Sequence, residues 1–335
     1  MLRTLLLLLL STVLLTSSVW AVLALYFQQA WGTLPRLLLM AGWCLALMVL
    51  MALLWNGRPW LVLLVYGLMF AALLAWWHSL KPSSERDWAD DLAHITTGEV
   101  QGDRLTLHNV RNFDWRTPQD YDIRWESREY DLSRLHSVDM ITSYWGRRAI
   151  AHVLVSFGFD DGQFVVFSVE IRRERGEEFS EIGGFFKQFE LSIIATDERD
   201  AVRVRTNVRN EDAYLYRIGL NPRDGRALLL SFVDEANRLA AEPRFYHTIS
   251  PNCTTLVFGM AHKILPHLPR DYRLLLTGYL PEYIKQLDGL EKGYDLEELR
   301  QRGRITERAI QAGSDPDFSR LIRRGVPGWD QAPDE

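Results

Sequence analysis

Cysteine is almost absent from this chain of 335 residues, which contains only Cys44 and Cys253. Cys44 lies in a strongly apolar stretch, whereas Cys253 lies far along the chain between Asn252 and Thr254. Two thiols so widely separated exclude the disulfide framework that holds small secreted domains together. Cys253 is therefore an unpaired thiol, and such a residue is an inert passenger, an intermolecular link or a reactive group.

Several signatures of catalysis are missing as well. The chain has no G-x-S-x-G, no H-E-x-x-H, no Walker loop, no C-x-x-C and no G-x-G-x-x-G that opens a helix. Its histidines do not have the spacing of metal ligands, so neither a metal nor another cofactor is predicted. Because these motifs are absent, the thiol of Cys253 is the clearest indication of a catalytic group.

Residues 1–80 contain no lysine and no acidic residue, although the whole chain has 43 aspartates and glutamates. Three apolar runs fill this part, and each is long enough to cross a hydrocarbon core about 30 Å thick as a helix. They cover residues 4–27, 37–55 and 60–77. The sequence therefore predicts a multi-pass membrane anchor with three transmembrane helices.

The few charges near these runs predict the orientation of the anchor. Arg3 and Arg58 favour the cytoplasm, against Arg36 alone in the intervening loop. This bias places the rest of the chain outside, which is the periplasm if the membrane is a bacterial inner membrane. The first run could instead be a cleaved signal peptide, and the later part would still be exported.

The exported part is acidic and has no basic stripe, which argues against nucleic acid as a partner. We expect a polar helix at residues 82–94, strands at 103–113, 121–132, 189–197 and 200–208, and helices at 224–243 and 253–265. Short helical pieces follow. The expected fold class is α+β, with a domain over residues 81–268 and a helical extension over residues 269–335.

The clearest local element is a β-hairpin at residues 151–173. Two apolar strands flank Asp160-Asp161-Gly162, with glycine at the left-handed position of the turn. A three-residue loop would place His152 opposite Glu170 on one face of the sheet. A two-residue turn would instead pair His152 with Ile171, and Glu170 could alternatively form an ion pair with Arg172.

Cys253 is predicted to begin a helix, because Ser250-Pro251-Asn252 is a turn signal and an apolar helical run follows. At a helix amino-terminus, unpaired N–H groups favour a thiolate and can receive a developing oxyanion. Asn252 could equally be only a turn or cap residue. A nucleophilic cysteine needs a base, and His152 within its apolar strand is the best candidate, with Glu170 holding the imidazole.

The stretch "AHVLVSFGFDDGQFVVFSVEIRRERGEEFS", followed by "FYHTISPNCTTLVF", resembles the bacterial Lnb-type periplasmic domain, a family named for a lipoprotein N-acyltransferase. The order of its motifs is similar to that of the permuted papain-like, NlpC-type thiol enzymes. The resemblance implies an antiparallel sheet with surrounding helices. One departure is Pro251, which stands where many relatives have a second asparagine.

Carried over residue by residue, the resemblance implies that Cys253 is the nucleophile, His152 its base and Glu170 the third catalytic group. It further implies that Cys253 takes an acyl chain from a membrane phospholipid as a thioester and passes it to the α-amine of a lipoprotein. Arg172 and Arg173 are expected to contact a phosphate headgroup. Asn252 and Tyr246 are expected to line the substrate site.

Two other functions remain open from the sequence. The same fold could support a periplasmic cysteine amidase or peptidase acting on cell-wall peptide. The exported part could also be a non-catalytic, membrane-anchored binding domain in which Cys253 is inert. The last reading predicts that Cys253 lies beyond hydrogen-bond reach of His152.

Overall fold

A computed structural model describes residues 1–28, 32–250 and 252–329. Pro251, which departs from the family pattern, lies outside the described residues. The chain divides into two compact units. The first contains residues 1–83, 179–189 and 245–248, and the second contains residues 84–178, 190–244 and 249–335.

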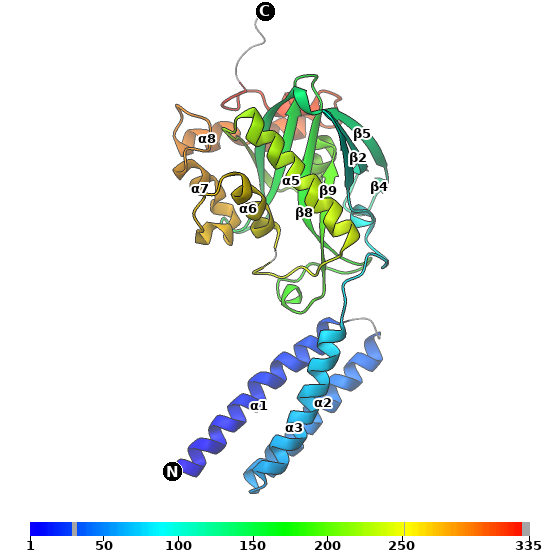
Figure 1. Ribbon diagram of the computed structural model, residues 1–335, viewed down its shortest axis with the longest axis vertical. Coiled ribbons are helices and arrows are strands. Elements are labelled where there is room, and N and C mark those ends of the chain that lie inside the picture. Colours follow the sequence, from blue (N-terminus) through cyan, green and yellow to red (C-terminus); the bar gives the residue numbers. More distant parts are fainter. Residues whose placement is uncertain (29–31, 251, 330–335) are drawn as a thin grey trace, which may run out of the picture. The chain divides into compact units, whose positions relative to one another are not determined.

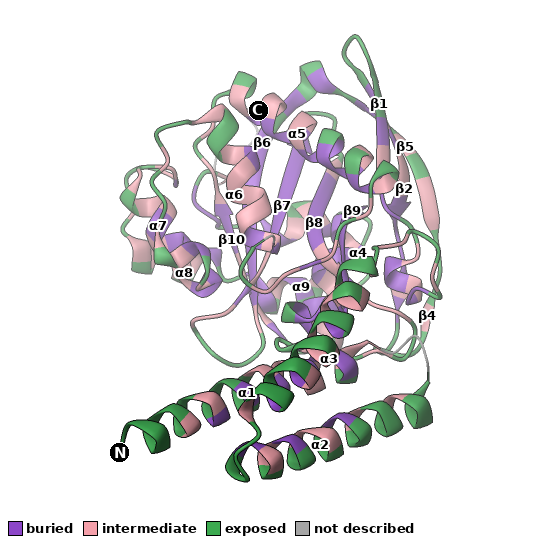
Figure 2. Ribbon diagram, turned by 60° about the horizontal axis from the view of Figure 1, so that its bottom comes forward, coloured by how far each residue is buried: buried purple, intermediate pink, exposed green. Residues whose placement is uncertain are grey.

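Three long apolar helices make up most of the first unit, as the sequence predicts (Figure 1). They are α1 (Leu2–Phe27), α2 (Thr33–Trp55) and α3 (Pro59–Ser79). Each is long and apolar enough to cross a membrane. Much of their outward surface is exposed (Figure 2), as expected for helices whose apolar side chains face lipid.

The second unit is built on an eight-stranded mixed sheet. Its strand order is β1-β2-β9-β8-β7-β6-β10, with β5 also pairing with β2. All pairs are antiparallel except β2 with β9. The strands are β1 (Thr97–Gln101), β2 (Arg104–Arg111), β5 (Trp125–Asp131), β6 (Leu135–Tyr144), β7 (His152–Phe159), β8 (Phe164–Arg172), β9 (Glu190–Thr196) and β10 (Asp212–Arg217). A separate small hairpin joins β3 (Asp114–Trp115) to β4 (Tyr121–Asp122).

The predicted hairpin of β7 and β8 is confirmed, together with its three-residue loop. The Phe159 N–H donates to the Gln163 carbonyl at 2.9 Å, and Gly162 has a positive φ of 84°. Leu154 pairs with Ser168 in the resulting register, so His152 and Glu170 fall at matching positions on one face. The alternative pairing of His152 with Ile171 is wrong.

Helices cover both faces of the sheet. On one face lie α5 (Pro222–Ala241) and α6 (Cys253–Ile264), and α5 crosses the strands in Figure 1. On the other face lie α4 (Glu198–Arg203), α9 (Thr306–Ala312) and α10 (Phe318–Ile322), whose apolar side chains pack with Leu154 and Val166. The central strands between these layers are almost wholly buried (Figure 2).

The carboxyl-terminal segment packs within the same unit as the sheet. Besides α9 and α10, it contributes α7 (Leu280–Gln286) and α8 (Leu296–Gly303). Leu280 of α7 and Leu299 of α8 share a buried cluster with Met140 and Tyr216 of the sheet. The region expected to be a helical extension is helical, and it supplies core to the sheet.

Two local predictions are wrong. Residues 200–208 are helical, forming the end of α4 and a π-helical turn η4 (Val204–Val208), because Asp197 caps the helix and Ala201, Val202 and Val204 bury against the sheet. Within residues 82–94 the helical part is limited to a short 3₁₀ turn, Asp90–Leu92, and Trp88 forms a β-bridge with Glu174. The α+β class is confirmed, whereas a papain-like arrangement is not confirmed.

Candidate functional site

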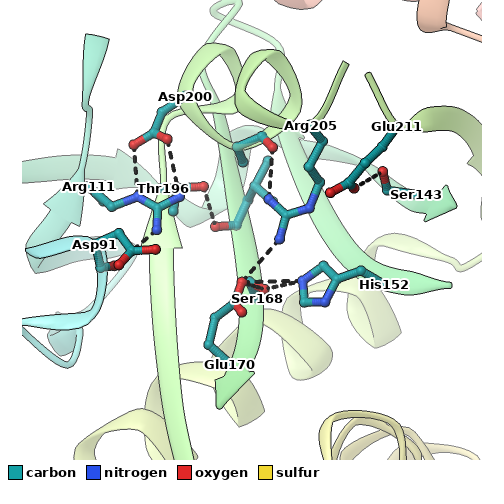
Figure 3. A network of polar contacts seen from close by, with 12 residues as sticks. Asp91, Arg111, Ser143, His152, Ser168, Glu170, Thr196, Asp200, Arg205 and Glu211 are labelled. Atoms are coloured by element: carbon teal, nitrogen blue, oxygen red, sulfur yellow. Dashed lines mark hydrogen bonds and ion pairs between the residues drawn. The ribbon is translucent and has the colours of Figure 1, made fainter. Parts of the chain in front are cut away.

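His152 opens β7 and takes part in a polar network on the α4 face of the sheet (Figure 3). Its Nε2 atom lies 2.8 Å from the Ser168 hydroxyl and 3.3 Å from Glu170 Oε1. The Ser168 hydroxyl in turn donates to Glu170 Oε1 at 2.6 Å. The pairing of a strand histidine with a carboxylate, predicted from the sequence, is thus present, with Ser168 between the two.

This network fixes the tautomer of the imidazole. Ser168 has one hydroxyl proton, and that proton is directed to Glu170. The Ser168 oxygen can then only accept from His152, so Nε2 carries the ring proton. The lone pair lies on Nδ1, which makes no hydrogen bond with any residue that the structure describes. A basic nitrogen therefore remains available.

Glu170 is held in its charged form. Arg205 Nη2 lies 3.2 Å from Glu170 Oε1, and the Arg205 Nη1 group donates to the Ala201 carbonyl at 3.0 Å. Burial raises the pKa of the Glu170 carboxyl, but His152, Arg205 and the Ser168 hydroxyl outweigh it. The pKa of Glu170 is consequently well below its ordinary value, and the carboxylate stabilises a positive charge on His152.

Cys253 is the first residue of α6, as the sequence predicts. Asn252 caps the helix, because its Oδ1 accepts from the N–H groups of Thr254 at 3.1 Å and Thr255 at 2.8 Å. The Thr255 hydroxyl accepts from the Asn252 N–H at 2.9 Å and completes a capping box. The contact of Asn252 with substrate stays a prediction, and its cap role is shown.

The half-buried thiol of Cys253 has few polar neighbours. Its sulfur lies 3.8 Å from the Thr254 hydroxyl. Burial raises the pKa of the thiol above its ordinary value, as does the Glu170 carboxylate, while the Thr254 hydroxyl and nearby N–H groups lower it. The helix amino-terminus does not by itself produce a thiolate, so deprotonation would need a base.

The N–H group of Cys253 differs from the next two in the helix. Asn252 already occupies the N–H groups of Thr254 and Thr255. Within the described residues, the Cys253 N–H has no acceptor on another residue. It is therefore the amide in the first turn that could donate to an oxyanion.

The structure does not join Cys253 to His152. Among the described residues no hydrogen bond links the two side chains. Phe258 of α6 packs with Met140 and Val153, and Val153 points to the face opposite to that of His152 because neighbouring strand residues alternate. The middle of α6 thus packs on the face opposite to that of His152, and the Glu170 carboxylate acts electrostatically on the Cys253 thiol.

Arg172 and Arg173 both have partners within the second unit. Arg172 is buried, stacks on Trp88 at 4.3 Å and donates to the carbonyls of Leu92 and Ala93. Arg173 Nη2 forms a forked bond to the two oxygens of Asp91, at 2.9 and 3.1 Å. The alternative ion pair of Glu170 with Arg172 is wrong, because Arg205 pairs with Glu170 instead.

Tyr246 lies in the other unit, within residues 245–248. Its side chain is buried, and its N–H donates to the Phe189 carbonyl at 2.9 Å. The contributions of Tyr246, Arg172 and Arg173 to a substrate site stay predictions.

Two residues of the network were not identified from the sequence. Ser168 could have been found, because it lies two positions before Glu170 and therefore on the same face of β8. Arg205 could not, since it lies 35 positions away on a helical segment that resembles a strand.

A cleft of about 1150 Å³ lies at the other end of β7 from His152. Its walls include Phe159, Asn112, Arg199, Arg324 and Trp329. It is separated from His152 by the length of the strand, roughly 20 Å. No group of three or more potential metal ligands occurs within the part of the chain that the structure describes.

Comparison with known proteins identifies a family for part of the chain. Residues 121–278 match a family model described as the Lnb N-terminal periplasmic domain, and this span includes His152, Glu170 and Cys253. No curated protein and no solved structure matches the chain.

Proposed function

From the premise that residues 121–278 are an Lnb N-terminal periplasmic domain, we propose that this chain is a membrane-anchored cysteine acyltransferase. Its acyl donor is a phospholipid, and its acceptor is the α-amine of a lipoprotein. The three apolar helices support this proposal because they would keep the domain at a membrane surface, where both substrates are found. The membrane in question is the bacterial inner membrane, with the domain on its periplasmic side.

The observation that carries the proposal is the network around His152. Ser168 and Glu170 fix the ring proton on Nε2, and Arg205 keeps Glu170 charged. This arrangement leaves Nδ1 as a base and stabilises the imidazolium formed when it takes a proton. A merely structural histidine would not need an anionic partner that is itself held by an arginine.

The first step moves the acyl chain to the protein. His152 Nδ1 takes the proton of the Cys253 thiol while the sulfur attacks the carbonyl carbon of the phospholipid ester. The Cys253 N–H donates to the oxyanion. The ester C–O bond then breaks, and the departing oxygen takes the proton from His152, giving a thioester and a lysophospholipid.

The second step moves the acyl chain to the acceptor. The lipoprotein amine attacks the thioester carbonyl and passes a proton to His152. The C–S bond breaks and the sulfur takes that proton back. Amide and free thiol result, so the cycle needs no cofactor. The raised pKa of the Cys253 thiol fits proton removal during attack, with no preformed thiolate.

The mechanism requires the thiol and the imidazole to approach each other when substrate binds. Catalytic hydrogen bonds are often long or absent without substrate and form in the reactive complex. His152 and Cys253 each begin their element, where a side chain is less enclosed than in the middle of a strand or helix. Arg172 and Arg173 would have to share their present partners with a lipid phosphate.

The test uses the full chain reconstituted in phospholipid vesicles. Mass spectrometry should detect an added acyl mass that hydroxylamine releases, together with free lysophospholipid. Cys253→Ala should show neither product. If the wild type forms no adduct and no lysophospholipid, transfer from phospholipid is wrong. Release of acyl chains only as free fatty acid would indicate a hydrolase, and cleavage of cell-wall peptide would favour the amidase function.

A second candidate function is a membrane-anchored binding domain without catalysis. The observation that favours it is the lack of a hydrogen bond between Cys253 and His152 among the described residues. The raised pKa of the thiol also fits an inert, half-buried cysteine. Under this function, Cys253→Ala would leave every activity of the chain unchanged.

A further inference from the structure

Residues 179–189 form a short loop that belongs to the same compact unit as the membrane helices. Phe186 of this loop is buried against aromatic rings of α1 and α3. Its ring centroid lies 5.5 Å from Phe27, in a stacked arrangement, 6.3 Å from Trp77 and 6.4 Å from Trp20. The loop is therefore packed against α1 and α3.

Polar contacts fix the same loop in place. The Gln28 side chain donates to the carbonyls of Phe186 at 2.7 Å and Lys187 at 3.0 Å. The Lys187 ammonium donates to the Trp77 carbonyl at 2.8 Å and lies 4.8 Å from the centroid of the Trp77 ring. These bonds hold the loop at the ends of α1 and α3.

The contacts also indicate the depth of the loop in a bilayer. The 26 residues of α1 span about 39 Å, which exceeds a hydrocarbon core of about 30 Å. Trp20 lies about two turns before the end of α1, roughly 10 Å along the axis. Tryptophans gather at the headgroup level, so Phe186, which contacts Trp20 and Trp77, lies at that level.

Three large apolar side chains of this loop are exposed. Phe179 and Ile182 are each 55% exposed and Phe185 is 40% exposed. Single exposed apolar residues are ordinary on a soluble surface, but these three occur within seven residues of a loop fastened at headgroup level. We propose that Phe179, Ile182 and Phe185 insert into the phospholipid leaflet around the helices.

The charges of the loop specify which lipid surface it fits. Glu181 is exposed within the loop, and Glu178, which is also exposed, immediately precedes the loop in the chain. Lys187 is directed to the Trp77 carbonyl. Carboxylates repel anionic headgroups, so the insertion depends on apolar burial in a zwitterionic leaflet and gains nothing from added anionic lipid.

Chain connectivity links this loop to the candidate site without requiring the proposed activity. The loop follows β8, which carries Glu170, and precedes β9. It is bonded to residues 245–248, because the Thr248 hydroxyl donates to the Glu181 carbonyl at 2.7 Å. Cys253 follows Thr248 by five residues in the sequence. The proposed lipid-contacting loop thus follows the strand that carries Glu170 and is bonded to the segment that precedes Cys253.

The experiment labels the full chain at one position with the environment-sensitive fluorophore NBD. In a Cys44→Ser, Cys253→Ala background, Ile182→Cys is labelled and reconstituted in phosphatidylcholine vesicles that contain spin-labelled lipid. Insertion predicts blue-shifted emission and quenching several-fold stronger than at the matched control Gln119→Cys, an exposed position in the turn between β3 and β4. Phe179→Cys provides a second site if labelling at residue 182 disturbs the loop.

The outcome does not depend on acyl transfer, since the background lacks the thiol. Emission and quenching at both loop positions equal to those at residue 119 would overturn the inference. Quenching that appears only when anionic lipid is added would overturn the assignment to a zwitterionic surface. Failure of transfer in the separate mass-spectrometry test would leave this result unaffected.

Discussion

Two charged networks lie on the same face of the sheet, and they differ in how completely they are closed. In the first, Arg323 binds Asp139 and Glu198 at 2.6 to 3.1 Å, and the side chains are 3%, 0% and 0% exposed. In the second, His152 and Glu170 remain 15% and 21% exposed. Burial of charge is thus nearly total in one network and incomplete in the other.

The two networks also differ in how completely their hydrogen-bonding atoms are occupied. Each guanidinium nitrogen of Arg323 donates to a carboxylate, and Asp139 also accepts from the Trp329 indole at 3.0 Å. His152 uses Nε2 and leaves Nδ1 without a partner among the described residues. The closed network is suited to holding α10 on the sheet, while the open network retains a group that can react.

Removal of the imidazole should have the largest effect. His152→Ala is expected to lower the rate of acyl transfer by about 10³-fold, within the range of general acid–base catalysis. The rate would be measured as lysophospholipid release from vesicles. His136→Ala is the control, because His136 is an exposed histidine of β6 and lies at the other end of the sheet from His152. Equal losses in the two variants would contradict a special role for His152.

Opening the closed network should affect stability and leave activity unchanged. Arg323→Met leaves Asp139 and Glu198 buried without their partner, which is expected to cost about 3–5 kcal/mol in the free energy of unfolding. Arg205→Met should cost only about 1–2 kcal/mol, since Glu170 keeps access to water. Denaturant unfolding in detergent micelles would measure both. Similar losses of unfolding free energy in the two variants would contradict the difference in burial between the two networks.

Loss of the bridging hydroxyl should have a smaller effect on catalysis. Ser168→Ala is expected to slow acyl transfer about tenfold, because His152 would keep only its 3.3 Å contact with Glu170. Ser156→Ala is the matched variant in the closed network, where the hydroxyl donates to Glu198 at 2.7 Å. It should leave transfer unchanged. A Ser168→Ala rate equal to wild type would mean that the tautomer is not set by Ser168.

The smallest expected effect is a change in the pH dependence of thiol reactivity. The negative charge of Glu170 raises the pKa of the Cys253 thiol, so Glu170→Gln should lower that pKa. The midpoint of alkylation by iodoacetamide against pH would then move to lower pH, and it would stay above the ordinary thiol value because burial persists. Cys44→Ser provides the single-thiol background. An unchanged midpoint would show that Glu170 does not act on Cys253.

The sequence predicted what depends on local patterns. Uniform apolarity identified the three membrane helices, and the turn at Gly162 fixed the register that pairs His152 with Glu170. The start of α6 at Cys253 followed from the turn signal before it. Each of these features depends on residues close together in the chain.

Other features depended on contacts that a single sequence does not reveal. The alternating valines of residues 200–208 favour a strand, but tertiary burial and the Asp197 cap favour a helix, which delivers Arg205 to Glu170. The face of the sheet on which α6 packs was equally unpredictable. β6 and β10, which extend the sheet, were also missed.

The unit that holds the membrane helices is assembled from three separated pieces of chain, and this has a practical meaning for dissecting the protein. Deleting residues 1–83 would not merely release a tether. The deletion would remove the residues of α1 and α3 that Phe186 and Lys187 contact. An aromatic surface would then be exposed to water. A secreted fragment beginning at residue 84 is therefore expected to aggregate, and replacing Phe186 with a polar residue should restore its solubility.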